Sequence, residues 1–400
     1  MTPVERAALA RALALASRDQ PRVSPNPAVG CVVLAEDRVV GEGVTEPPPG
    51  RHAEVVALAA AGAAARGATA VVTLEPCAHH GRTPPCTEAL LAAGVARVVI
   101  AHPDPHPLAG GGAARLAAAG VTVDGPLEAD APLRQAVARH LEGFLTVVER
   151  ARPHVTLKVA QTGDGAVHHP TGRRWITGAA ARRAVHRWRA AVDGVLVGSG
   201  TVLADDPRLD VRDVPTDRQP VAVILDARLR TPPSARVVRP GTVLVTLAGQ
   251  TGQGGGAGAG PGAGADRERE RRRRALTSAG VRVLSVPGAP DGQGLLLPAA
   301  LASLADHGLV SLLAEPGPTL SGALLRAGLV DRLVRHVAVH LGSGVPTAVL
   351  CPPGDAWRLE RSGGAGTDAI VQYLATGAAT TPQPRHPPTR QESPDVHRHR

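Results

Sequence analysis

Short apolar segments alternate with Ala- and Leu-rich segments of helical spacing along the first 150 residues, and this alternation limits the fold more than any other feature. The expected helices cover residues 3–17, 53–65, 87–93, 113–119 and 132–150, and the expected strands cover residues 29–34, 70–74, 96–101 and 121–124. Strands that alternate with short helices form layered α/β sheets. We therefore predict one α/β domain over residues 1–150, which ends at Ala151-Arg152-Pro153.

A second series of strands and helices follows, so we predict a second domain over residues 151–376. Its expected strands cover residues 154–160, 194–197, 221–225, 243–247, 281–286, 309–314 and 332–340, and its expected helices cover residues 179–191 and 320–327. Residues 249–274 interrupt it with a Gly/Ala run and an Arg-rich stretch. Such a segment cannot bury enough apolar surface to fold, so we expect a disordered insertion there. The Pro-, Arg- and His-rich residues 377–400 are expected to form a disordered tail.

The formal net charge of +9 is concentrated in these two segments. Residues 266–274 hold six Arg against three acidic residues, and residues 378–400 hold four Arg against two. They contribute +3 and +2, which leaves +4 for the rest of the chain. This is a solvated or tail-like distribution rather than a binding face for nucleic acid. With three Trp, one Tyr and one Phe, the chain is also poorly suited to stacking on the bases of single strands.

Nothing at the N-terminus resembles a signal peptide, since charged residues interrupt its apolar residues. No apolar run has the roughly 20 residues that a membrane-spanning helix needs. The cysteines are Cys31, Cys77, Cys86 and Cys351. We expect them to be reduced thiols in a soluble cytoplasmic protein.

One His and two Cys lie where the fold could bring three metal ligands together. His52-Ala53-Glu54 begins an expected helix, Cys77 follows a buried strand, and Cys86 begins the next helix. Three protein ligands leave the fourth position of zinc open for water, as in catalytic sites, and a helix start favours the thiolate form of Cys86. This order of residues is the zinc-deaminase pattern. We predict His52, Cys77 and Cys86 as ligands of one Zn²⁺, and Glu54 as the catalytic residue that carries protons to the leaving amine.

The spacing of the two cysteines makes the pattern more specific. Three segments resemble the bifunctional deaminase–reductase family of riboflavin biosynthesis: Pro25–Gly30, His52–Glu54 and Thr73–Cys86. Other cytidine and transfer-RNA deaminases usually have two residues between the cysteines, whereas eight residues with His-Gly-Arg-Thr-Pro-Pro separate them here. The resemblance implies a cytidine-deaminase-like three-layer domain that acts on 2,5-diamino-6-(5-phosphoribosylamino)pyrimidin-4-one. It also implies that this substrate is bound by Asn26, His79 and Arg82.

The second half carries weaker signals of its own. Lys158, the only Lys, lies in an apolar strand, where a charge is costly unless it is paired. The alternative is a side chain whose ammonium reaches water at the strand end. Gly317–Gly322 precedes an expected helix whose backbone amides could hold a phosphate, although a simple turn can have the same sequence. No G-x-G-x-x-G sequence follows a strand here, so a Rossmann site is not supported.

Four segments of this half resemble the reductase domain of the same family: Lys158–Gly165, Trp175–Gly178, Gly198–Leu209 and Glu315–Leu320. The resemblance implies a dihydrofolate-reductase-like domain that uses NADPH to reduce the ribose of the intermediate to ribityl. It assigns to NADPH the residues Ala160, Trp175, Thr201, Asp205, Gly317, Pro318, Thr319, Leu320, Ser321, Gly322 and Ala323. It assigns to the substrate Arg189, Leu209, Arg212 and Glu315. Two arginines suit a sugar phosphate because guanidinium binds phosphate bidentately.

Two other interpretations remain open at this point. After the turn Gly41-Glu42-Gly43, Thr45 stands where the family usually has His, and His106 stands where it usually has Asn. Arg173-Arg174 replaces an expected substrate-binding Ser. These departures favour a diverged paralogue that deaminates a related pyrimidine with a weak or inactive reductase half, and the basic segments would suit a nucleic-acid-binding deaminase. We favour a small-molecule substrate without nucleic-acid or membrane partners, and the resemblance allows a homo-oligomer.

Overall fold

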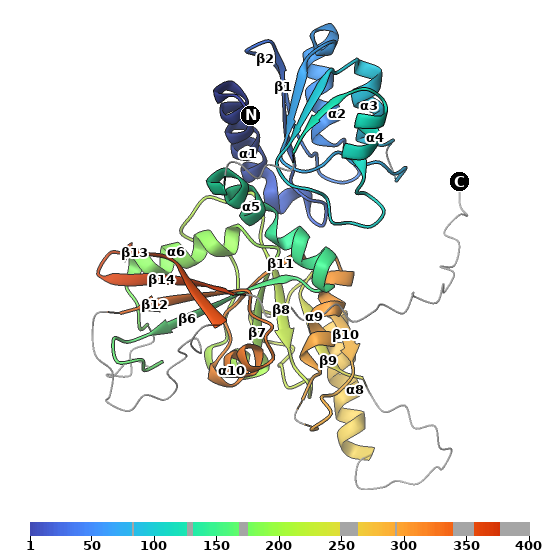
Figure 1. Ribbon diagram of the computed structural model, residues 1–400. Helices are drawn as coiled ribbons and strands as arrows, with labels where there is room; N and C mark the ends of the chain where they lie inside the picture. The colour runs from blue at the N-terminus through green and yellow to red at the C-terminus, as the bar shows by residue number, and fades with distance from the viewer. Residues whose placement is uncertain are drawn as a thin grey trace.

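The computed structural model describes residues 1–81, 84–125, 131–167, 175–248, 263–292, 294–338 and 356–376. Two α/β units follow one another along the chain, the first drawn in blue to blue-green and the second in green to red (Figure 1). Arg82, Arg173-Arg174 and the tail expected over residues 377–400 lie outside the described residues. No helix of the described part is long and apolar enough to cross a membrane.

The first unit is built on a five-stranded sheet in the order β2-β1-β3-β4-β5. Its strands are β1 (Gly30–Ala35), β2 (Arg38–Val44), β3 (Thr69–Val72), β4 (Arg97–Ile100) and β5 (Thr122–Asp124). Its helices are α1 (Pro3–Val23), α2 (Ala53–Ala61), the 3-10 helix η1 (Gly62–Ala65), α3 (Cys86–Ala93), α4 (Gly112–Ala118) and α5 (Ala131–Arg150). β1 is antiparallel to β2 and β3, whereas β3, β4 and β5 are parallel. Helices cover both faces of the sheet, which explains why β1, β3 and β4 are apolar without alternation.

The segment Gly41-Glu42-Gly43 lies inside β2, so the turn expected there is wrong. Its glycines serve packing instead. A Cβ on Gly43 would lie 2.2 Å from the carbonyl oxygen of Ala53 and 2.5 Å from the amide nitrogen of Ala57. β2 can therefore lie directly against α2, the helix that begins beside His52.

The second unit is a nine-stranded sheet in the order β10-β9-β8-β7-β11-β6-β12-β14-β13. Its strands are β6 (His154–Gln161), β7 (Gly194–Gly198), β8 (Val221–Leu225), β9 (Val243–Leu247), β10 (Arg282–Val286), β11 (Ser311–Ala314), β12 (Arg332–Val337), β13 (Trp357–Ala365) and β14 (Asp368–Ala375). Its helices are α6 (Ala179–Ala190), α7 (Ser199–Asp205), α8 (Ala263–Ser278), α9 (Leu297–Asp306) and α10 (Pro318–Arg326). The strands are parallel except at β14 and β13, which form an antiparallel hairpin on β12. Alternate residues of β7 face opposite cores, since Val195 and Val197 pack in one apolar cluster and Leu196 in the other.

The Arg-rich part of the expected insertion is helical, so the prediction of disorder over residues 263–274 is wrong. Within α8, Glu268 pairs with Arg272 at 2.8 Å and Glu270 with Arg274 at 2.9 Å. Such pairs one turn apart stabilise a helix by about 0.2–0.5 kcal/mol each. Leu276 is fully buried, and Arg269 donates to the carbonyl oxygen of Leu247 at 2.7 Å, which anchors the helix on the sheet. Residues 249–262 lie outside the described residues.

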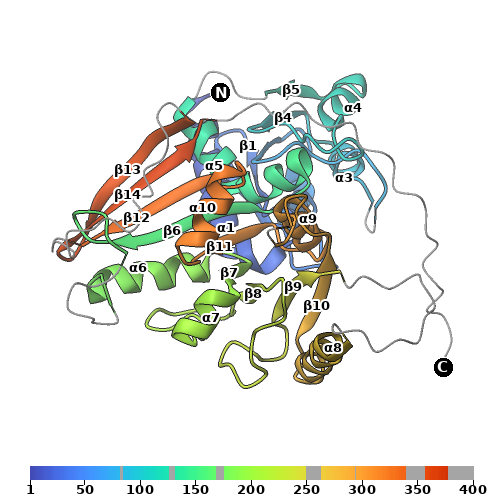
Figure 2. The ribbon, with the colours of Figure 1, turned by 90° about the horizontal axis from the view of Figure 1, so that it is seen from below.

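Ion pairs join the two units at α5, which lies between them in Figure 1; in the view from below the two units overlap (Figure 2). Arg332 at the start of β12 donates to both carboxylate oxygens of Glu142 on α5, at 2.6 and 2.8 Å. Its neighbour Asp331 accepts two hydrogen bonds from Arg152 and one from Arg150, at 2.6–2.8 Å. Burial opposes the charge of Asp331, yet these hydrogen bonds lower its pKa below the ordinary value. The junction is therefore a buried ionic contact that holds charged partners from both units.

Candidate active sites

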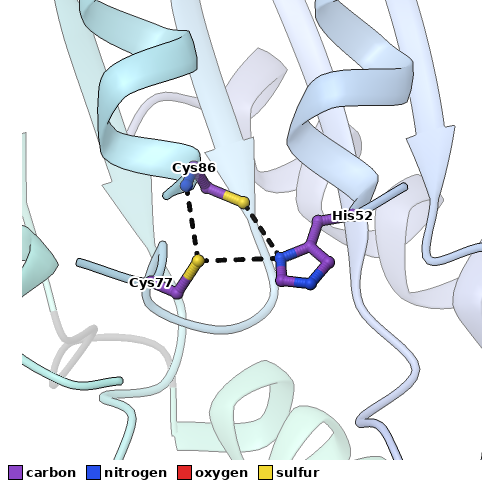
Figure 3. Close-up of side chains that lie close together, drawn as sticks. All are labelled: His52, Cys77 and Cys86. Atoms are coloured by element: carbon purple, nitrogen blue, oxygen red, sulfur yellow. Dashed lines mark hydrogen bonds between the residues drawn. The ribbon is translucent and has the colours of Figure 1, made fainter. Parts of the chain in front are cut away.

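Three potential metal ligands converge in the first unit, as Figure 3 shows. The Nδ1 atom of His52 lies 3.2 Å from the sulfur of Cys86 and 3.6 Å from the sulfur of Cys77. All three donor atoms lie within 4.8 Å of one another. Zinc bonds of about 2.3 Å to sulfur and 2.0–2.1 Å to nitrogen place neighbouring donors of a tetrahedron about 3.6 Å apart. One imidazole and two sulfurs at this spacing fit a zinc ion with one position left for water.

Each donor owes its place to the end of an element. His52 is the residue before α2, Cys86 is the first residue of α3, and Cys77 lies in the loop that leaves β3. The backbone amide of Cys86 donates to the sulfur of Cys77 at 3.3 Å. Because the amides of a first helical turn have no partner within the helix, this end of α3 is free to stabilise a thiolate.

The pKa values of the two cysteines are shifted in opposite directions. The hydrogen bond from Cys86, helped by another from His52, lowers the pKa of Cys77 well below that of a free thiol. The pKa of Cys86 is raised, because its thiol donates to Cys77 and because it is buried. One of the two sulfurs is thus ready to bind a cation as a thiolate, and a metal would displace the proton from the other.

Glu54 lies in the first turn of α2 and is 3% exposed. Burial raises the pKa of its carboxyl group above the ordinary value, and the negative charge of Cys77 adds to this effect. A carboxyl group that is buried beside three ligands has the properties of a proton carrier rather than of a surface charge.

Glu75 supports the loop that carries Cys77, a role that was not predicted from the sequence. One oxygen of its carboxylate accepts the amide of Ala113 at 2.9 Å, and the other accepts the amide of Asp104 at 3.1 Å. Gly112 at the start of α4 packs so closely that a Cβ there would lie 1.8 Å from the carbonyl oxygen of Pro76. The position of this half-buried Glu immediately before Pro-Cys would have been the signal for this role.

The residues expected to bind the pyrimidine lie at the same end of the sheet as Cys77. Asn26 is exposed in the loop before β1, and the first residue of β1 exchanges two hydrogen bonds with Thr73, just before that cysteine loop. His79 stacks on His106 with ring centroids 6.5 Å apart. Its Nδ1 atom is buried and has no partner among the described residues. Thr45 accepts the amide of Val29 at 3.1 Å.

In the second unit, Glu315 is the centre of a charged cluster beneath α6. Arg189 donates to Glu315 at 2.7 Å, and the ammonium of Lys158 lies 4.0 Å from the other carboxylate oxygen. Burial opposes ionisation of Glu315, but the charges of Arg189 and Lys158 lower its pKa. Leu209 is buried, whereas Arg212 joins the cluster only at its margin, through an ion pair with Asp210 and a backbone hydrogen bond to His186 at 3.1 Å.

The residues expected to bind the cofactor are more widely spread than the cluster around Glu315. The amide of Gly317 donates to the hydroxyl of Thr201 at 3.1 Å, which joins the start of α10 to α7. The amides of Thr319 and Leu320 lie in the first turn of α10 and have no partner within that helix. This turn therefore fits a phosphate group. Trp175 is 52% exposed, with the guanidinium of Arg182 5.3 Å from its ring centroid. The remaining residues of the set are Ala160 at the end of β6, Asp205 at the end of α7, and Pro318, Ser321, Gly322 and Ala323 in α10.

Two family models match the chain. The cytidine and deoxycytidylate deaminase zinc-binding region matches residues 3–102, and the RibD C-terminal domain matches residues 153–361. The riboflavin biosynthesis protein RibD of Aquifex aeolicus is 39% identical over 342 residues, which cover 84% of this chain and 87% of the relative. The same protein of Escherichia coli strain K12 is 40% identical over 349 residues, covering 83% and 87%. The chain belongs to the RibD family.

Solved structures of RibD proteins share the architecture. Acinetobacter baumannii RibD is 34% identical with a TM-score of 0.77, covering 94% of this chain and 99% of that one. A Thermotoga maritima protein, described as a diaminohydroxyphosphoribosylaminopyrimidine deaminase and 5-amino-6-(5-phosphoribosylamino)uracil reductase, is 29% identical with a TM-score of 0.74, covering 93% and 99%. The predicted deaminase domain and dihydrofolate-reductase-like domain are confirmed. As a RibD protein, the chain is an enzyme of riboflavin biosynthesis, and the diverged-paralogue interpretation is not favoured.

Proposed function

We propose that this chain hydrolytically deaminates 2,5-diamino-6-(5-phosphoribosylamino)pyrimidin-4-one with zinc, and then reduces the ribose of the product to ribityl with NADPH. The observation that carries the proposal is the convergence of His52 Nδ1 with the sulfurs of Cys77 and Cys86 beside the buried Glu54. The charged cluster of the reductase domain supplies a site for the second step. The description of the Thermotoga maritima relative supports this class of substrate.

In the first step, zinc held by His52, Cys77 and Cys86 would supply a Lewis acid that makes water a nucleophile near neutral pH. Glu54 takes a proton from the water as the water oxygen adds to the carbon of the pyrimidine that bears the amine. It returns a proton to the amine nitrogen as the C–N bond breaks and ammonia leaves. The raised pKa of Glu54 suits a carboxyl group that must both accept and release this proton.

Asn26, His79 and Arg82 are proposed to hold the substrate in the deaminase site. Asn26 offers an amide to the edge of the pyrimidine from the loop before β1. The buried Nδ1 of His79 has no partner among the described residues, so a polar group of the substrate could satisfy it. Arg82 lies outside the described residues, and its guanidinium is assigned to the substrate from the resemblance alone.

In the second step, NADPH would supply a hydride for C1 of the ribose. We propose that the first turn of α10, Thr201 and Trp175 bind the cofactor, together with Ala160 and Asp205. Arg189, Leu209, Arg212 and Glu315 are proposed to bind the sugar and its phosphate. The link between Thr201 and Gly317 supports this division, because it joins the start of α10 to α7, whereas Glu315 pairs with Arg189 on α6.

We propose that the deaminase domain covers residues 1–150 and the reductase domain residues 151–376, which agrees with α5 ending at Arg150 and β6 beginning at His154. A cytoplasmic location suits an enzyme that consumes NADPH. A homo-oligomer remains a proposal from the resemblance.

Purified protein incubated with this diaminopyrimidine tests the proposal. With zinc bound and NADPH absent, we expect one equivalent of ammonia per substrate. With NADPH present, one further equivalent of NADPH is oxidised. Ammonia release without NADPH consumption would overturn the reductase assignment. If the protein neither released ammonia nor oxidised NADPH, the substrate assignment would be overturned.

A further inference from the structure

His336 in β12 is an unusual residue for the interior of a sheet. Its side chain is fully buried, and neither ring nitrogen has a hydrogen-bond partner among the described residues. A buried polar group without a partner costs about 1–3 kcal/mol. Burial and the nearby charge of Lys158 lower the pKa of His336 to about 4. The imidazole is therefore neutral at physiological pH, and one of its nitrogens is an acceptor without a donor.

Lys158 in β6 has hydrogen-bond donors that lack acceptors in the described part of the chain. Its ammonium carries three N–H donors, and its side chain is 17% exposed. The nearest anion is Glu315 at 4.0 Å, which is an ion pair but too long for a hydrogen bond. The described residues show no hydrogen bond from this ammonium.

The sheet places these two side chains on the same face. β6 and β12 are parallel neighbours, with Lys158 opposite Val334 and Ala160 opposite His336 (Figure 1). Side chains two residues apart in a strand point to one face. Lys158 and His336 are thus diagonal neighbours, one with free donors and the other with a free acceptor.

The other charged or titratable groups around Lys158 are Glu315 after β11, and Arg189 and His186 on α6. Arg189 remains bound to Glu315 at 2.7 Å. Burial, followed by the charge of Arg189, opposes the ammonium form and lowers the pKa of Lys158. Of the groups around Lys158, His336 is the neutral one on a strand paired directly with β6, and so it can accept from the ammonium without adding charge.

We propose that His336 is a positioning residue of the reductase site, whose imidazole accepts a hydrogen bond from Lys158 when the ammonium leaves Glu315. The proposal rests on the proposed reductase function. Movement of Lys158 to His336 frees one carboxylate oxygen of Glu315, while Arg189 holds the other. The freed oxygen can then accept a hydrogen bond from a hydroxyl group of the open sugar chain.

Because Lys158 is the only Lys, isotope-labelled lysine gives one NMR signal for its side chain. With the reduced ribityl product bound, where the ammonium has left Glu315, we expect His336→Phe to lower the pKa of Lys158 by about one unit, a tenfold change in the acid constant. In the ligand-free protein, where Lys158 is paired with Glu315, the same substitution should change that pKa little. His336→Gln, which keeps an acceptor, should leave that pKa near its wild-type value. His154→Phe removes another buried imidazole, at the far end of β6, and should not move the signal. An unchanged Lys158 titration in product-bound His336→Phe would overturn the proposal.

Kinetics give a second measurement in the same proteins. We expect His336→Phe to lower the kcat of NADPH oxidation about tenfold with little change in the KM for NADPH, and His336→Gln to retain most of it. Ammonia release from the deaminase domain should be unchanged in both. Thermal unfolding separates this role from a loss of stability. Replacing an unpartnered imidazole with an apolar ring should keep or raise the Tm of His336→Phe, so its lower kcat would not come from unfolding. Equal losses in Phe and Gln would contradict the proposal, whereas no NADPH oxidation by the wild-type protein would contradict the reductase function and leave the NMR result to decide His336.

Discussion

Glu54 combines two opposing influences at the scale of a single residue. Burial raises the pKa of its carboxyl group, while its place in the first turn of α2 favours a negative charge. The ligands at His52 and Cys86 hold their positions through helix ends and not through Glu54. Its function can therefore be removed without removing the metal ligands.

For Glu54→Gln, we expect the kcat of deamination to fall by a factor of about 10²–10⁴, which is the usual contribution of a positioned proton carrier. Zinc content, measured by elemental analysis, should stay at one ion per chain, and NADPH oxidation with deaminated substrate should be unchanged. Glu88→Gln, an exposed glutamate on α3, serves as the control and should retain activity. Loss of zinc in Glu54→Gln would show that Glu54 holds the site together instead.

At the scale of elements, the geometry of the proposed zinc site depends on how α2 lies against β2. Gly43 lets the strand approach the first turn of the helix, where a Cβ would lie 2.2 Å from the oxygen of Ala53. That turn carries both His52 at its start and Glu54. A displacement of α2 moves a ligand and the proton carrier together, while Cys77 and Cys86 stay with β3 and α3.

Gly43→Ala is expected to destabilise the deaminase domain by about 1–3 kcal/mol, as overpacking usually does. Zinc affinity and deamination should both fall, because α2 must shift away from β2. Thermal unfolding and titration with a zinc chelator measure the two effects. Gly363→Ala in β13 is the matched control, since a Cβ there meets nothing within 4 Å, and it should change neither quantity. Zinc affinity equal to that of the wild-type protein would refute the packing argument.

At the scale of the whole molecule, the junction between the domains contains two buried histidines. His140 on α5 shares a hydrogen bond with the carbonyl oxygen of Ala28 at 2.7 Å, and His154 begins β6 near Glu142. Burial lowers the pKa of both side chains. The folded protein therefore keeps them neutral to a lower pH than the unfolded chain, which protonates them below about pH 6.5.

The sign of the pH effect follows from this difference. Below about pH 6.5 the unfolded state binds more protons, so the free energy of unfolding should fall as the pH drops toward the lower folded pKa values, and it should be constant above that pH. Urea unfolding at pH 7.5 and pH 5.5 measures this change in the free energy of unfolding. His154→Gln should reduce the difference between the two pH values, while His307→Gln, an exposed histidine, should not. Equal stability of the wild-type protein at both pH values would contradict the prediction.

The three candidate zinc ligands could be singled out from the sequence because each one stands beside a local signal. His52 and Cys86 lie at helix starts, and Cys77 follows a buried strand. The charged helix α8 was missed because its stability comes from pairs such as Glu268–Arg272 rather than from an apolar stripe. The hairpin of β13 and β14 was missed for a related reason, since β13 is mostly exposed and shows no alternation of apolar residues.

Contacts between distant segments lie beyond what periodicity can show. The neighbouring positions of Lys158 and His336 depend on β6 and β12 being adjacent, although the two residues lie 178 positions apart in the sequence. The support that Glu75 gives to Ala113 and Asp104 depends on how α4 packs near Pro76. Local patterns identify the ligands, but the sheet order decides which polar groups surround them.

The ion pairs between Glu142, Arg332, Asp331 and Arg152 also determine how this enzyme can be taken apart. An isolated fragment of residues 1–150 would expose Glu142 without Arg332, and an isolated reductase fragment that begins at β6 would leave Asp331 buried without either of its arginines. Removing one member of a buried pair commonly costs about 3–5 kcal/mol. A recombination event that replaces one domain with that of a relative must therefore preserve the charged residues on both sides of this contact. The two domains are expected to be inherited together for this reason.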